Sequence, residues 1–124
     1  MVNLVGPYNT GKAVGVDGAA TINIDIKRLT GCVRGVGVKY NGDKPATADL
    51  IIKGKGTTSL TKPILTVTNG NTDSWFFPHE VIDGVDGAAV AGTYTPVYID
   101  DVVNIELKES NTDDTVDVWF LLEN

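Results

Sequence analysis

Few residues of this chain have the type and spacing that catalysis or metal binding requires. The one histidine, His79, follows Pro78 and precedes Glu80, so a histidine-based metal site or a conventional catalytic triad lacks its other members. The one cysteine, Cys32, excludes an intrachain disulfide and a cysteine-based zinc site. We therefore predict that the protein is not an enzyme, with no catalytic or cofactor-binding residues and no bound cofactor.

Two glycine-rich segments resemble phosphate-binding loops without completing one. Residues 6–13, Gly-Pro-Tyr-Asn-Thr-Gly-Lys-Ala, nearly spell a P-loop, in which backbone amides cradle phosphates and a Ser or Thr holds Mg²⁺. Ala13 stands where that Mg²⁺ ligand would be, and Pro7 has no amide hydrogen to donate. Residues 54–58, Gly-Lys-Gly-Thr-Thr, have no helical pattern after them. We interpret both segments as loops, the second within a polar loop over residues 53–62.

Carboxylates in loops and at strand ends are the remaining candidates for chemistry. Hard cations such as Ca²⁺ bind clusters of carboxylate oxygens, but the spacing of an EF-hand loop is absent from this chain. No metal ligands are assigned, and a structural Ca²⁺ stays open beside the alternative of a solvated acidic rim. The residues concerned are Asp83, Asp86, Asp100, Asp101, Asp113 and Asp114.

Length and charge limit the class of protein. The 124 residues suffice for one domain, and a formal net charge of −6 argues against binding to a nucleic-acid backbone. No apolar run approaches the roughly 20 residues of a membrane helix, and the start of the chain lacks the pattern of a signal peptide. We expect a soluble protein made in the cytoplasm, with neither nucleic acid nor membrane as a partner.

Alternating apolar and polar residues predict strands rather than helices. Ile22, Ile24 and Ile26 alternate with polar residues, and residues 116–122 repeat the pattern near the end of the chain. The sequence predicts an all-β fold, a single-domain β-sandwich or jelly roll of about eight short antiparallel strands. The β domain should span residues 20–124, and residues 1–19 should form a Gly-rich extended N-terminal arm. The predicted strands cover residues 22–26, 36–40, 50–52, 64–68, 75–77, 94–99, 103–107 and 116–122, and residues 79–93 should be the longest irregular stretch.

Aromatic side chains on these strands are candidates for an interface. In a strand Trp75 and Phe77 share one face and Phe76 takes the other. Aromatic residues on a sheet pack in a core, centre a subunit interface, or stack on sugar rings. We expect Trp75, Trp119 or both to be substantially buried, because their strands are rich in apolar neighbours. The interface candidates are Val2, Leu4, Val5, Trp75, Phe76, Phe77, Tyr94, Tyr98 and Trp119.

Two segments carry a resemblance to a known family. Residues 65–78, Leu-Thr-Val-Thr-Asn-Gly-Asn-Thr-Asp-Ser-Trp-Phe-Phe-Pro, and residues 115–123, Thr-Val-Asp-Val-Trp-Phe-Leu-Leu-Glu, resemble a pattern in small proteins encoded near the major capsid gene of tailed bacteriophages. The segments 86–89, 94–96 and 99–103 lie between them in the expected order. The likeness covers roughly residues 28–123, and His79 stands where the pattern often has a basic residue.

Such proteins look like head decoration or cement proteins, which are β-rich, often trimeric, and sit where capsomers meet. The resemblance implies a structural virion protein on the outer capsid surface, with the major capsid protein as partner and a homotrimer as the oligomeric state. The alternative is a carbohydrate- or host-surface-binding β module, such as a head fibre or tail appendage.

Overall fold

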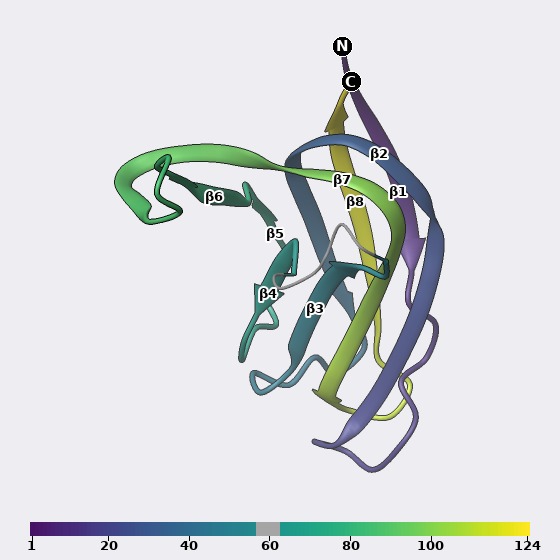
Figure 1. The fold of residues 1–124 in the computed structure, drawn as a ribbon. Helices are drawn as coiled ribbons and strands as arrows, with labels where there is room; N and C mark the ends of the chain where they lie inside the picture. The colour runs from purple at the N-terminus through teal and green to yellow at the C-terminus, as the bar shows by residue number, and fades with distance from the viewer. Residues whose placement is uncertain (57–62) are drawn as a thin grey trace.

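The computed structural model describes residues 1–56 and 63–124, and its described residues form an all-β fold without a helix. This confirms the predicted fold class. No helix in that part of the chain could cross a membrane. The strands are β1 (Val2–Asn9), β2 (Ala20–Asn41), β3 (Asp49–Gly54), β4 (Leu65–Val67), β5 (Ser74–Phe76), β6 (His79–Asp83), β7 (Ala89–Ser110) and β8 (Thr115–Glu123) (Figure 1).

The strands pair in the order of a jelly roll. One sheet runs β1–β8–β2–β5 and uses the second half of β2, while the other runs β2–β7–β3–β4 and uses the first half. Every one of these pairs is antiparallel. A double-sheet jelly roll has this arrangement when β2 is counted as two strands.

The prediction of short strands is wrong for β2 and β7, which have 22 residues each. The strand β2 continues from one sheet into the other (Figure 1). Gly31 and a register shift between Val33 and Gly35 lie where its pairing changes from β7 to β8. Gly31 has a φ of 137°, and a Cβ there would lie 2.8 Å from the carbonyl oxygen of Glu123. A glycine is therefore needed where the strand turns.

The inner faces of the two sheets form one apolar core. Along β8 the even-numbered residues are buried and the odd-numbered ones are half-buried, as the pleat of a strand requires. Phe120 is fully buried, and its ring lies 6.1 Å from that of Tyr8 on β1. The core also contains Val33, Val36, Leu50, Ile52, Ile99, Val103, Ile105 and Leu107.

The predicted N-terminal arm is not separate from the domain. Residues 2–9 form β1, which pairs with β8 from Val2 opposite Glu123 to Asn9 opposite Asp117. Thr10 and Ala13 are buried, and their amides donate to carbonyl oxygens of Val116 and Asp114. Sequence reasoning missed this strand because its outward face is exposed, which leaves no regular apolar alternation.

We expect deletion of residues 1–9 to destabilise the whole domain. The deletion would remove the backbone hydrogen bonds between β1 and β8 and uncover Phe120 on the core side. Each lost hydrogen bond contributes about 0.5–1.5 kcal/mol, so the combined loss should be several kcal/mol. Thermal unfolding of the truncated and intact chains measures it, and an unchanged melting temperature would contradict the assignment of β1 to the folded domain.

Residues 79–93, predicted to be irregular, instead contain β6 and the start of β7. His79 pairs with Pro96, and Val81 with Tyr94, which makes a two-stranded hairpin. We call residues 79–96 the β6–β7 arm, because Figure 1 shows it extending away from the two sheets. The strand β7 continues through Pro96, which pairs with His79 of β6. Most of the predicted loop 53–62 lies outside the described residues.

Candidate binding surface

The outer face of the β1–β8–β2–β5 sheet exposes a strip of apolar side chains. Trp119 and Leu121 of β8 point outward, since their even-numbered neighbours fill the core. Gly37 of β2 pairs with Trp119 on one side and with Trp75 of β5 on the other. Leu4 of β1 pairs with Leu121 and continues the strip to the sheet edge. Four strands thus contribute to one apolar surface.

Glycines form the floor beneath the aromatic rings. A Cβ on Gly37 would lie 2.9, 3.0 and 3.1 Å from three atoms of the Trp75 benzo ring, and a Cβ on Gly6 would lie 3.3 Å from Cδ1 of Trp119. Gly35 is similarly close to side-chain atoms of Leu121 and Phe77. A register shift between Val33 and Gly35 also interrupts the pairing of β2 with β8 at this place. Side-chain atoms of Leu121, Phe77 and Trp75 occupy the space that a side chain at Gly35 or Gly37 would need.

A groove of about 390 Å³ opens between the two tryptophans. Its walls are Trp75 and Trp119, with Gly37 between them, and its polar rim lies toward one end of the sheet. Trp75 remains 45% exposed there, and Trp119 is half-buried. The groove is lined by Leu4, Gly37, Val38, Lys39, Asp73, Ser74, Trp75 and Trp119.

Asp73 at the rim is held by the backbone. One carboxylate oxygen, Oδ1, accepts a hydrogen bond of 2.9 Å from the amide of Tyr40. Burial raises the pKa of Tyr40 to about 12, with a further contribution from the Asp73 charge, so this phenol stays neutral in ordinary buffers. The neighbouring Ser74 hydroxyl donates only a long 3.3 Å bond to the carbonyl of Trp75. The rim therefore offers polar atoms in fixed positions.

A row of polar side chains follows the tryptophan row along the same face. Asp117 of β8 pairs with Asn9 of β1 and with Lys39 of β2. Its Oδ1 accepts a hydrogen bond of 2.7 Å from the side-chain amide of Asn9, and its Oδ2 accepts one of 3.1 Å from the side-chain amide of Asn41. Asn9 in turn accepts 2.7 Å from the backbone amide of Gly11. The polar row is thus ordered before any ligand binds.

The structure brings only some of the predicted interface residues together. Leu4, Trp75 and Trp119 line the groove, and Phe77 lies exposed beside the strip. Val5 and Phe76 instead pack against the core. Of the two tryptophans, one or both of which we expect to be substantially buried, Trp75 is 45% exposed and Trp119 is half-buried. Val2 is exposed two residues before Leu4 on β1, and Tyr94 and Tyr98 are exposed on β7.

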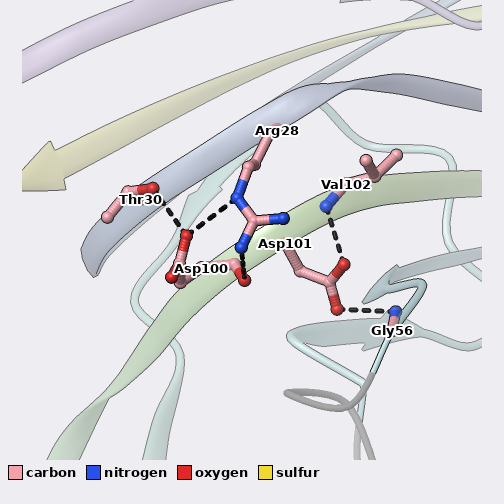
Figure 2. Close-up of polar contacts among 6 residues, drawn as sticks. All are labelled: Arg28, Thr30, Gly56, Asp100, Asp101 and Val102. Atoms are coloured by element: carbon pink, nitrogen blue, oxygen red, sulfur yellow. Dashed lines mark hydrogen bonds and ion pairs between the residues drawn. The ribbon is translucent and has the colours of Figure 1, made fainter.

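The adjacent carboxylates Asp100 and Asp101 point in different directions (Figure 2). Asp100 accepts 3.0 Å from Nε of Arg28 and 2.9 Å from the hydroxyl of Thr30, and these contacts lower its pKa. Asp101 is buried and accepts from the amides of Gly56, at 2.6 Å, and Val102, at 2.8 Å. Both side chains therefore join strands and a loop of the fold.

The remaining sequence candidates are dispersed. The described residues contain no group of three or more His, Cys, Asp or Glu side chains that could hold a metal ion. The first half of the P-loop look-alike, residues 6–9, lies in β1, and Gly6 packs against Trp119. The His79 ring packs edge-on against Tyr94 at a centroid distance of 4.5 Å, at the base of the β6–β7 arm.

The β6–β7 arm combines apolar exposure with negative charge. Ile82, Val85, Val90 and Tyr94 are all exposed along it. Residues 79–96 also contain three acidic side chains and no lysine or arginine. The arm is therefore a second surface suited to a partner, and its chemistry differs from that of the tryptophan groove.

Sequence reasoning missed several residues of the groove. These are Gly37, Lys39 and Asp73. They acquire their places through the pairing of β1, β8, β2 and β5, which a single sequence does not reveal. One signal was available: glycines alternating with apolar residues in β2 indicate that one face of that strand accommodates something large.

Comparisons with known proteins do not place this chain in a family. No protein-family model and no curated protein matches it. Among solved structures, a crystal structure of FLHE covers 99% of this chain and 95% of its own, with a TM-score of 0.37 and 8% identity. The catalytic unit of a thermostable GH87 alpha-1,3-glucanase from Streptomyces thermodiastaticus strain HF3-3 covers 98% of this chain, with a TM-score of 0.36 and 16% identity. This chain spans 26% of the glucanase unit. Overlaps of this quality carry no functional argument.

Proposed function

We propose that this chain is a non-enzymatic structural protein of a virion, a decoration or cement protein that stabilises contacts between neighbouring major capsid protein subunits. The observation that carries the proposal is the β6–β7 arm, a projecting hairpin with exposed apolar side chains. The jelly-roll fold and the resemblance of residues 65–78 and 115–123 to small phage head proteins support the same role.

The β6–β7 arm has little stability of its own. A two-stranded hairpin is at best marginally stable in water, and it needs a third strand or an apolar surface to become firm. Ile82, Val85, Val90 and Tyr94 offer such a surface from the side of the arm. A partner that covers the arm would bury these side chains and pair the free edge of β6.

The charge of the arm indicates the kind of partner. Glu80, Asp83 and Asp86 would be complementary to a basic surface, and they would speed encounter with it at low salt. We assign this partner as the major capsid protein, with further copies of the same chain completing a homotrimer. Three linked arms would bind with a high effective concentration even when each contact is weak.

Charge reversal on the arm tests this function. We expect Glu80→Lys combined with Asp83→Lys to weaken attachment to capsids that lack the protein by about tenfold or more, with a loss that shrinks at high salt. Co-sedimentation with capsids measures attachment, and light scattering measures oligomeric state. Glu106→Lys, a charge reversal on the body of β7, is the matched control and should bind normally.

Two results would contradict the assignment. If the arm variant sediments with capsids as well as the unmodified chain does, the arm is not the attachment surface. If the unmodified chain is a monomer at high micromolar concentration and binds no capsid, the virion role fails.

A second candidate function, a carbohydrate- or host-surface-binding module, is favoured by one separate observation, the groove between Trp75 and Trp119. The groove combines two tryptophan walls with polar side chains at its rim, whereas the arm combines exposed apolar side chains with acidic ones.

A further inference from the structure

We propose that the groove between Trp75 and Trp119 is a binding site for a neutral pyranose sugar at an end or within a chain of a glycan. This inference gives the second candidate function a site and a class of ligand. It does not depend on the virion role, because every residue of the groove belongs to one chain.

The two tryptophans occupy neighbouring positions on one face of the sheet. Atoms of the Trp75 benzo ring lie 2.9–3.1 Å from where a Cβ on Gly37 would stand, and Trp119 is the partner of Gly37 on the other neighbouring strand. A pyranose presents axial C–H groups on its faces, and these pack on the electron-rich face of an aromatic ring. Two indoles held on one sheet face can contact one sugar or two consecutive sugars of a chain.

Polar side chains stand beside the two tryptophans at the rim of the groove. Sugar hydroxyls need partners for donation and acceptance, and such groups must stand beside the aromatic surface. Asp73 holds one oxygen on the Tyr40 amide, which leaves its second oxygen to accept from a hydroxyl. Lys39 and the Ser74 hydroxyl stand on the same rim. The groove therefore has an apolar floor and a hydrogen-bonding edge.

The volume of the groove suits a small ligand. Pockets for small molecules usually measure about 300–1,000 Å³ and combine apolar walls with a few polar groups. The groove, at about 390 Å³, lies at the small end of this range and matches one or two sugar rings. A flat protein interface would not require a glycine floor, since larger residues on β2 would widen the contact area.

The charges around the groove favour an uncharged ligand. Among the described residues that line the groove, Lys39 is the one cation, against the carboxylate of Asp73 and that of Asp117 in the next row. The chain as a whole carries a formal charge of −6. Both facts disfavour sulfated sugars and uronic acids, so the ligand should be a neutral hexose unit.

Nuclear magnetic resonance of the intact chain tests the proposal, because the protein has only two tryptophans and hence two indole N–H signals. The probes are maltohexaose, cellohexaose, laminarihexaose, galactose and mannotriose as neutral ligands, with heparin and polygalacturonate as anionic ones. We expect at least one neutral probe to shift both indole signals saturably, and the anionic probes to leave them unmoved.

Variants locate the binding. Trp75→Ala and Trp119→Ala should each weaken the affinity for the bound sugar by about tenfold or more. Gly37→Ala should also weaken it, because the added Cβ displaces the Trp75 ring while both tryptophans remain. Tyr98→Ala removes an exposed aromatic residue outside the groove and serves as the matched control with normal binding. A normal melting profile shows that each variant is folded.

Several outcomes would overturn the proposal. They are the absence of a saturable shift with every neutral probe at millimolar concentration, unchanged binding by folded Trp75→Ala, or equal binding of the anionic probes. Indole shifts that depend on protein concentration and not on sugar would mark the groove as an interface between copies, which also overturns it. Capsid attachment by the arm is measured separately, so either proposal can fail alone.

Discussion

Replacement of Phe120 with alanine should lower the free energy of unfolding by about 3–5 kcal/mol. Phe120 is the largest fully buried side chain of the core, and it lies between β1 and the second half of β2. Its removal leaves a cavity that cannot collapse easily, because the strands on both sides are fixed by hydrogen bonds. Urea-induced unfolding, followed by intrinsic fluorescence, measures the loss.

The matched control is Leu121→Ala on the neighbouring position of β8. Leu121 faces outward and is half-buried, so its loss should cost distinctly less than that of Phe120. If both variants lose the same stability, the inward and outward faces of β8 are assigned wrongly.

Replacement of Asp114 should have the second largest effect. This carboxylate is 2% exposed and lies in the turn between β7 and β8. Its oxygens accept 2.7 Å from the Ser110 hydroxyl, 3.0 Å from the Asn111 amide and 2.8 Å from the Asp43 amide. It therefore ties the turn after β2 to the turn before β8.

Asp114→Asn should cost on the order of 3 kcal/mol, because an amide group places hydrogens where buried donors need an acceptor. Asp113→Asn is the matched control: Asp113 is exposed, and its φ of 68° suits asparagine as well as aspartate. Urea unfolding of both variants at neutral pH gives the comparison. Equal stabilities would show that the buried hydrogen bonds of Asp114 contribute nothing.

The same carboxylate should make stability depend on pH. Burial alone would raise the pKa of Asp114, but hydrogen bonds from Ser110, Asn111, Asp43 and Lys44 together lower it below the usual value. A lowered pKa in the folded state means that the stabilisation is complete above the unfolded pKa, near 3.9, and is lost as pH falls through the folded value. Urea midpoints between about pH 5 and pH 2 should therefore fall less steeply in Asp114→Asn than in the unmodified chain.

Local patterns in the sequence predicted most of the body of the fold. Residues 116–122 show regular alternation because β8 lies with one face on the core, and the same holds for Ile22 to Ile26 of β2. The joining of the predicted strands into 22-residue strands was not predictable, since Gly31 and Pro96 are usually breaks. Here pairing with a neighbouring strand carries the chain through both positions.

The strands that the sequence did not predict form because they pair with strands distant in the chain. Residues 1–9 form a strand because β8 offers an edge, and residues 79–83 because β7 continues beyond the sheet. The groove has the same origin. The sequence identified the aromatic residues as candidates. The register of strand pairing then decides that Trp75 and Trp119 line the groove, that Phe76 points inward and that Tyr98 lies far from them.

The passage of β2 through both sheets has a consequence for how the protein comes apart. Neither sheet can unfold while the other remains intact, because half of β2 would then have to separate from its partner strands while the other half stays paired. The amides of both sheets should therefore exchange with deuterium through a single, global opening, with no partly open species that loses one layer first. Pulling on the molecule should likewise give one rupture event for the body, and the β6–β7 arm, held by neither layer, would yield before it.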